Sequence, residues 1–245
     1  EIEIFLIFML IRQPIKPYTM EYTKADFEPT VGDAYNHGWK TIWKYFLELF
    51  LVGLLLFIIS IPVNAFSFLI REDGNWFGIG IFVVFSAAYG ILILGPLQYG
   101  MYYCYLKAVR RENLQVGDLF AFKDNDLNVM LAALLTNLII GIGIFMLIIP
   151  GIRFACKLAF VPYLVIDKKM DAIKAVQASW QMTDGYAVNI FVMGLLAIFI
   201  AIGGLIAFLI GVIIAAMWIY ASFASIYYSV DSTQLQEAEG SGSEV

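Results

Sequence analysis

Two cations, Arg153 and Lys157, lie four residues apart in an otherwise apolar run that is bounded by prolines. This spacing places both side chains on one face of a helix. A cation inside a bilayer costs roughly 3 kcal/mol or more unless it contacts protein or water. Two interpretations follow. The pair holds an anionic headgroup or solute between helices, or Arg153 reaches the membrane surface while Lys157 binds carbonyls freed by Pro150 and Pro162.

The groups expected beside Lys157 are uncharged. They are the side chains of Asn137, Gln98 and Asn64, together with the freed backbone carbonyls. The pattern of apolar segments places no acidic residue deep in a predicted span, where it could neutralise the lysine. We therefore predict a candidate site, for an anion or lipid headgroup or for helix packing, formed by Arg153, Lys157, Asn137 and Gln98.

The remaining residues that could do chemistry give weak patterns. His37 is the single histidine, and no Ser or Cys has a deep histidine and carboxylate to activate it. Cys104 and Cys156 lie in apolar segments without CxxC spacing, which is typical of buried hydrophobic cysteines. Asp124 and Asp126 lack further ligands and are predicted to cap a helix. We predict no catalytic residue, no metal and no cofactor, and therefore no enzyme.

The composition places these residues in a membrane. Of the 245 residues, 61% are hydrophobic and only 14% are charged, unlike a soluble domain of this length. The ranges 75–106 and 185–230 contain no Asp, Glu, Lys or Arg. One crossing needs about 20 apolar residues, so the second range must hold two spans, and we predict the turn at Gly203 and Gly204. The net charge of -5, without a basic face, argues against nucleic acid as a partner.

The apolar pattern predicts an all-α integral membrane protein with six transmembrane helices and three interfacial amphipathic helices. The predicted spans are 47–69, 76–106, 127–149, 151–166, 186–202 and 205–230. Pro96 is expected to bend the second span, and Pro150 and Gly151 to separate the third and fourth. The interfacial helices are predicted near 31–45, 114–126 and 170–182, with three membrane anchors: Trp39, Trp43 and Trp180.

A weak internal similarity accompanies this layout. The segments are VGDAYNHGW at residue 31, VGDLFAF at 116 and DAIKAVQASW at 171. Each contains an acidic residue able to cap a helix, then small and aromatic residues, and each precedes a pair of spans. Two interpretations stay open. The chain is a threefold repeat of an interfacial helix and a helical hairpin, or helices that enter a bilayer share this pattern.

Charge predicts the orientation and the domain limits. Most loop cations fall on one side: Lys24, Lys40, Lys44, Lys107, Arg110, Arg111, Lys123, Lys168, Lys169 and Lys174. By the positive-inside rule both termini are then cytoplasmic. We predict an N-terminal extension at 1–30, a six-helix membrane domain at 31–230 and a mobile acidic tail at 231–245. Residues 1–19 lack an initial Met and contain two prolines shortly before Met20, so Met20 is the expected natural start.

Residues 150–186 read PGIRFACKLAFVPYLVIDKKMDAIKAVQASWQMTDGY. This segment resembles a broad group of poorly characterised bacterial multi-pass membrane proteins, including the membrane domain attached to some glycerophosphodiester phosphodiesterases. The features that carry the resemblance are Pro150, Gly151, Lys157, Pro162, Asp167, Ala175, Ser179, Trp180, Thr183 and Gly185. The resemblance implies a helical membrane domain that accompanies or anchors another protein. It does not extend to the phosphodiesterase chemistry, because this sequence lacks the soluble barrel.

We therefore predict a non-catalytic multi-pass protein of the bacterial inner membrane that acts as a scaffold or accessory subunit of a larger assembly. Its predicted partners are the lipid bilayer and other membrane protein subunits. The alternative is a permease for small solutes or lipids, with its anion site at Arg153 and Lys157. The sequence has neither a deep carboxylate for ion coupling nor a GxxxxGK[ST] nucleotide motif, which counts against active transport.

Overall fold

The computed structural model describes residues 25–71, 76–146 and 148–242, and every regular element in these ranges is a helix. The predicted all-helical class is confirmed. The elements are α2 (Val31–Lys44), α3 (Phe46–Arg71), α4 (Trp76–Tyr89), η1 (Gly90–Leu94), α5 (Gly95–Val109), η2 (Val116–Asn125), α6 (Asp126–Met146), α7 (Ile148–Lys157), α8 (Val161–Asp167), α9 (Ala172–Met182), α10 (Ala187–Ile206) and α11 (Phe208–Gly242).

Six helical stretches in the described ranges are long and apolar enough to cross a bilayer, as the sequence predicted. They are Phe46–Val63, Ile79–Val109, Asp126–Phe145, Ile149–Asp167, Ala187–Ile206 and Ile210–Gln236. Large apolar side chains stay exposed along them, most densely on α3, α4 and α10. Because such surfaces are unfavourable in water, these helices need lipid or other apolar contact.

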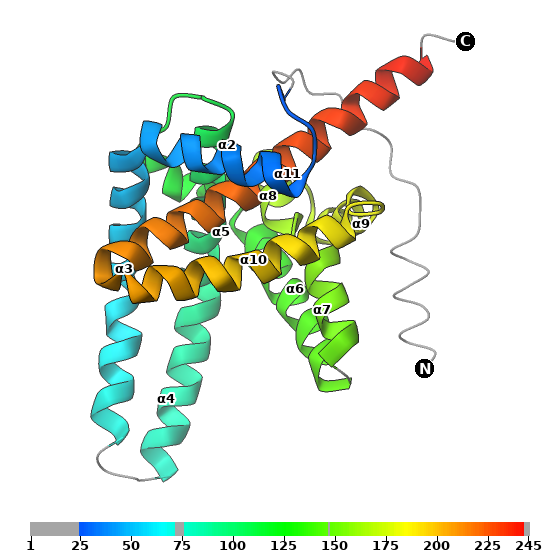
Figure 1. The fold of residues 1–245 in the computed structure, drawn as a ribbon. Helices are drawn as coiled ribbons and strands as arrows, with labels where there is room; N and C mark the ends of the chain where they lie inside the picture. The colour runs from blue at the N-terminus through cyan, green and yellow to red at the C-terminus, as the bar shows by residue number, and fades with distance from the viewer. Residues whose placement is uncertain (1–24, 72–75, 147, 243–245) are drawn as a thin grey trace, which may run out of the picture.

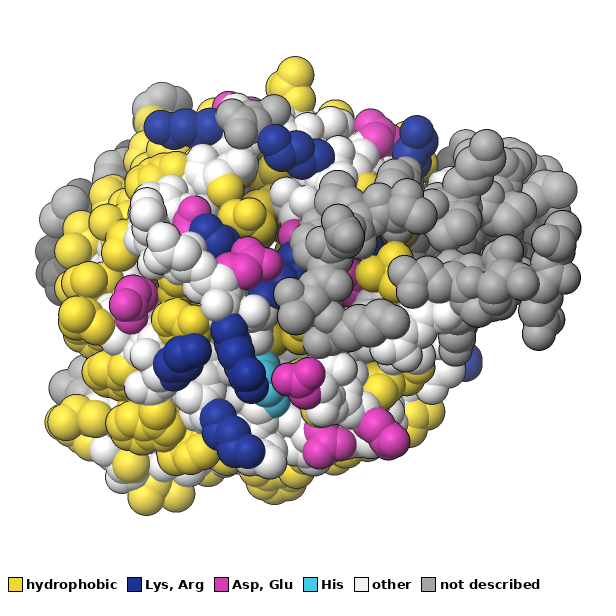
Figure 2. Space-filling model, turned by 90° about the horizontal axis from the view of Figure 1, so that it is seen from above, with side chains coloured by type: hydrophobic (Ala, Val, Ile, Leu, Met, Phe, Trp, Pro, Cys, Tyr) yellow, Lys and Arg dark blue, Asp and Glu magenta, His cyan; other side chains and the backbone are white. Residues whose placement is uncertain are grey.

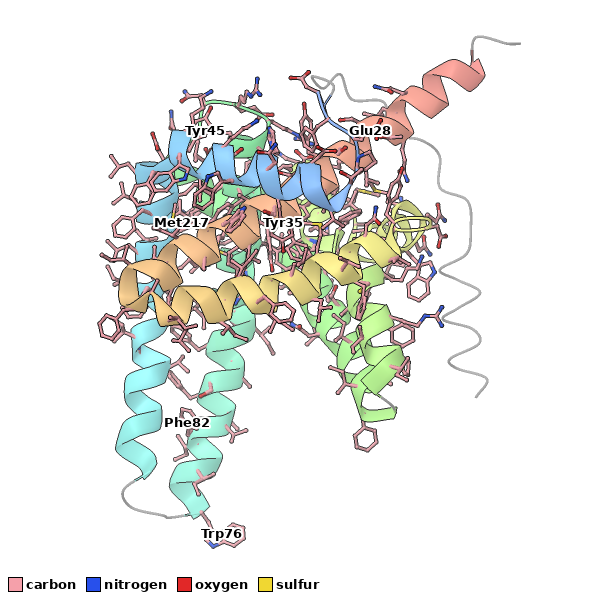
Figure 3. All side chains as sticks on the ribbon, viewed as in Figure 1. Glu28, Tyr35, Tyr45, Trp76, Phe82 and Met217 are labelled. Carbon is pink, nitrogen blue, oxygen red and sulfur yellow. The ribbon has the colours of Figure 1, made fainter. Side chains whose placement is uncertain are left out.

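The helices pack as three antiparallel pairs of different tilt. In Figure 1, α3 and α4 project together away from the other helices, with exposed Trp76 at their tip in Figure 3. Helices α6 and α7 form the second pair, and α10 and α11 run across the direction of α3 and α4 (Figure 1). Helix α11 contacts α2, α3, α5, α9 and α10. It is therefore the element around which the described core is built.

We predicted a bend of the second span at Pro96. In the structure this span changes from α-helical to π-helical winding just before that proline. Residues 90–94 form a π-helical turn, in which the Gly95 N–H donates to the Gly90 carbonyl five residues earlier. A proline removes one helical hydrogen bond, and its ring crowds the carbonyl four residues before it. The wider π turn accommodates both effects, so α4 and α5 continue as one apolar stretch.

The turn between α6 and α7 lies before the Pro150–Gly151 pair at which we expected it. Helix α6 ends at Met146, and Pro150 lies in the first turn of α7, where its missing N–H leaves no helical bond unmade. Gly151 instead allows close packing, because a Cβ on Gly143 would lie 3.0 Å from the Gly151 Cα atom. Pro150 thus lies at the start of the fourth span, and Gly151 lets this span pack closely against α6.

The turn between α10 and α11 corrects a second prediction. We expected it at Gly203 and Gly204, but α10 continues to Ile206 and the chain reverses at Ala207 and Phe208, whose φ is +64°. Gly204 serves packing, because a Cβ there would lie 2.6 Å from the Ala215 Cβ. The small residue lets the two helices approach closely.

The first described residues pack onto the C-terminal helix, α11. The Ser229 hydroxyl donates to the Phe27 carbonyl at 2.9 Å, and the Ala25 N–H donates to the Ser232 hydroxyl at 3.2 Å. Helix α11 continues to Gly242 and buries Asp231, so the start of the tail predicted at 231–245 belongs to a packed helix. The expected natural start at Met20 lies outside the described residues.

The three segments predicted as interfacial are helical, although the second is a 3-10 helix with non-helical backbone at Phe120. Helices α2 and α9 each begin with a side-chain cap, from Thr30 and Asp171 respectively. The face seen from above in Figure 2 carries Lys and Arg side chains among Asp and Glu, with hydrophobic side chains along its left margin. The interfacial position of these helices and the threefold repeat stay predictions.

Candidate functional site

The segment with Arg153 and Lys157 contains a break between two helices. Helix α7 ends at Lys157, α8 begins at Val161, and Pro162 lies in the first turn of α8. The Ser179 hydroxyl of α9 donates to the Lys157 carbonyl at 2.8 Å and accepts from the Phe160 N–H at 3.2 Å. One buried hydroxyl therefore satisfies a backbone group on each side of the break, so the break is a fixed feature of the fold.

The amine of Lys157 has a partner that we did not predict. It forms an ion pair with the carboxylate of Asp184, and it lies over the Trp180 ring at 5.8 Å from the centroid. The lysine side chain is 16% exposed and that of Asp184 is 70% exposed. The uncharged partners expected from the sequence are thus replaced by a carboxylate and a ring from the end of α9.

The other members of the predicted site do not join this ion pair. Arg153, Asn137 and Gln98 are exposed, and no hydrogen bond or ion pair links them to Lys157 in the described part of the chain. The Asn64 side chain lies outside the described residues. Arg153 and Lys157 lie on the same helix, but among the described residues an acidic group holds Lys157 and not Arg153.

The three predicted tryptophan anchors have different surroundings. Trp39 and Trp43 on α2 are 38% and 54% exposed, and their ring centroids lie 5.5 Å apart. Trp180 is half-buried and lies 5.8 Å from the ring of Phe154 on α7. Trp39 also packs on Trp218 of α11, with ring centroids 4.8 Å apart, and Trp180 packs the junction between α7 and α9. The exposed parts of Trp39 and Trp43 can contact a membrane surface directly.

A buried cluster of four charged side chains lies where α5, α8 and α11 meet. The guanidinium of Arg110 donates two hydrogen bonds to Asp167, at 2.7 and 2.8 Å. Asp231 lies 3.8 Å from Arg110 and forms an ion pair with Lys168. The exposed fractions of these side chains are between 4% and 7%.

The four buried members of the cluster balance one another, since two cations face two carboxylates. A third carboxylate, of the 40% exposed Glu112, lies 4.0 Å from Arg110. Taking charges out of water costs several kcal/mol per ion, and only close, well-directed partners offset that cost. The bidentate bond between Arg110 and Asp167 supplies such geometry. From the sequence, we predicted Arg110 and Lys168 only as loop cations and placed Asp231 in the tail. One sequence feature could have indicated this cluster: each of these charged residues lies directly beside an apolar run.

The remaining candidates have structural surroundings. The ring of His37 stacks on Phe27 at 4.5 Å, and its Nδ1 lies 3.1 Å from the Ser225 hydroxyl. Burial lowers the pKa of His37 to about 4, so the ring is neutral at neutral pH. Cys104 is buried and Cys156 is half-buried. Among the described residues, no group of three or more potential ligands could hold a metal ion.

Comparisons of the chain with protein-family models, with curated proteins and with solved structures found no match. The resemblance of residues 150–186 to bacterial multi-pass proteins therefore stays a prediction. Two polar assemblies within the described ranges bear on function. Both of them, the break joined by Ser179 and the cluster around Arg110, hold helices to one another.

Proposed function

We propose that this chain is a non-catalytic multi-pass protein of the bacterial inner membrane that acts as a scaffold or accessory subunit of a larger membrane assembly. Both termini are cytoplasmic in this proposal. One observation carries it. Within the described ranges, the cations with mostly buried side chains are each paired with a carboxylate of the same chain, so they leave no surplus positive charge for an anionic substrate: Lys107, Arg110, Lys157 and Lys168.

The pair of Lys157 and Asp184 is the clearest case. Lys157 is the residue that the permease hypothesis needs as an anion ligand, yet its amine already contacts a carboxylate. An anion would have to displace Asp184 or share the lysine with it. The carbonyl of Lys157 is likewise bound, by Ser179. These contacts favour a packing role for the segment between α7 and α9.

The apolar outer surface supports a role within the membrane. Exposed side chains of α10 include Phe191, Leu195, Phe199 and Ile202, and α3 and α4 project with similar surfaces. Lipid contacts such surfaces directly, and helices of other subunits pack against them through van der Waals contact and small residues. The resemblance of residues 150–186 to membrane domains that accompany other proteins supports the same proposal.

A permease is the second candidate, and the break between α7 and α8 favours it. Discontinuous membrane helices often mark substrate sites in transporters. Arg153, which is exposed and four residues before Lys157, would then be the first contact for an anion. This candidate requires a wetted path to Lys157 and an anion flux across the membrane.

Native purification of the full chain in mild detergent, followed by mass spectrometry, tests the proposal. A scaffold copurifies with one membrane protein at fixed stoichiometry, and a chemical crosslink connects the same two chains in intact membranes. The same preparation is then reconstituted into vesicles and assayed for anion flux. A chain that purifies alone and conducts anions contradicts the scaffold.

Lys157→Met separates the two candidates at a single residue. Its partner Asp184 is 70% exposed, so loss of the ion pair should cost only about 0–1 kcal/mol of stability. A scaffold variant therefore stays folded and keeps its partner, whereas a permease variant loses flux. Asp184→Asn is the matched control, because it breaks the same pair but leaves the cation in place. A wild type that binds no partner, with an anion flux that is lost in Lys157→Met but kept in Asp184→Asn, would contradict the scaffold proposal.

A further inference from the structure

Helix α2 is held rigidly by its inner face. The Trp218 indole N–H of α11 donates to the Tyr35 carbonyl at 2.9 Å, and the Tyr35 hydroxyl donates to the Met193 carbonyl of α10 at 2.8 Å. A Cβ on Gly38 would lie 2.6 Å from the Ser222 hydroxyl oxygen, so the two backbones are close. Figure 3 shows Tyr35 between α2 and α11. The outer face of α2 is therefore presented in a fixed orientation.

The outer face begins a row of aromatic rings that leads into the first span. The Trp39 and Trp43 centroids lie 5.5 Å apart, those of Trp43 and Phe46 5.9 Å, and those of Phe46 and Phe50 6.1 Å. Between residues 47 and 63 the exposed side chains of α3 are apolar, beginning with Leu47. Tryptophans at such a transition from a polar to an apolar surface are typical of the headgroup level of a membrane.

Two exposed lysines accompany this row. Lys40 and Lys44 are one helical turn apart, and neither forms an ion pair within the described part of the chain. The other titratable groups of α2 and of its junction with α3 form no ion pair with these lysines within the described ranges. Asp33 caps the far end of α2 with Thr30, His37 is neutral, and Glu48 is half-buried in the first turn of α3.

We propose that Lys40, Lys44, Trp39 and Trp43 form a binding surface for anionic phospholipid headgroups. The tryptophans lie among the headgroups and acyl chains, and the two ammonium groups contact lipid phosphates. The positive charge, the exposed indoles and the adjoining apolar face of α3 together match the charge and polarity gradient of an anionic leaflet. This surface is separate from Arg153 and Lys157, and the proposal goes beyond the scaffold function.

The test uses the full chain, purified in detergent and stripped of lipid, with phosphatidylglycerol and phosphatidylcholine as probes. Binding of each lipid is measured by native mass spectrometry and by the shift of melting temperature on lipid addition. Lys40→Gln/Lys44→Gln removes two exposed cations from α2. Lys123→Gln/Lys174→Gln is the matched control, because both of these lysines are exposed and form no ion pair in the described ranges.

We expect the wild type to prefer phosphatidylglycerol over phosphatidylcholine. Each lysine near an anionic surface contributes about 1 kcal/mol, so the α2 double variant should bind phosphatidylglycerol about 30-fold more weakly. Its binding of phosphatidylcholine and the affinities of the control should change by less than about 3-fold. The proposal is overturned if the wild type shows no preference, or if both double variants lose the same affinity.

Discussion

Removing the charge of Arg110 alone should destabilise the protein more than removing Arg110 and its partner together. In Arg110→Met, Asp167 loses its bidentate partner while Asp231 keeps Lys168, so the buried cluster carries an uncompensated negative charge. In Asp167→Asn the uncompensated charge is positive. The combined variant leaves the neutral pair of Lys168 and Asp231, which restores the balance of charge.

The magnitude follows from the burial of these groups. All four side chains are at most 7% exposed, and breaking a buried pair by removal of one partner typically costs 3–5 kcal/mol. We therefore expect each single variant to lose about 3–5 kcal/mol, and the combined variant to lose less than Arg110→Met alone. The coupling between Arg110 and Asp167 is then about 3 kcal/mol or more.

Unfolding of the four proteins by SDS in mixed micelles, followed through tryptophan fluorescence, gives the free energies of this cycle. Arg111→Met is the matched control, because Arg111 is the next residue in the chain but is 62% exposed and lies 4.0 Å from an exposed Asp26. We expect the control to change stability by less than about 1 kcal/mol. Additive single effects, or single effects no larger than the control, would refute the assignment of a coupled buried cluster.

Two further predictions concern packing and pH. Gly100→Ala should cost about 3 kcal/mol or more, because a Cβ there would lie 1.8 Å from the Leu119 carbonyl oxygen. Gly53→Ala meets no atom within 4 Å and should stabilise α3 by about 0.5–1 kcal/mol, so equal melting temperatures would contradict the packing. Burial lowers the pKa of His37 from 6.5 to about 4, so only the unfolded chain binds a proton there at intermediate pH. Stability should therefore fall as the pH drops from about 6.5 towards 4, and melting curves of His37→Asn should lose part of this dependence.

Lys157 shows most clearly which contacts the sequence predicted and which it did not. Its apolar neighbours indicated that the amine must contact protein or water, and Pro150 and Pro162 indicated freed backbone carbonyls nearby. The partner itself, Asp184, follows α9 and belongs to a segment that the sequence places outside the spans. Ser179, which joins the two sides of the break, carried no signal beyond its place in the resemblance.

The sequence by itself determined the helical membrane class and the approximate limits of the six apolar stretches. The physical reason is local: the length and polarity of a continuous segment decide whether a helix can satisfy its backbone in hydrocarbon. The tertiary structure alone decided which charged side chains form ion pairs and whether a glycine packs two helices or turns the chain. Arg110, Asp167 and Asp231 are far apart in the chain, and Gly204 packs two helices rather than turning the chain. Ion pairing and close packing depend on distances between helices, which no single segment contains.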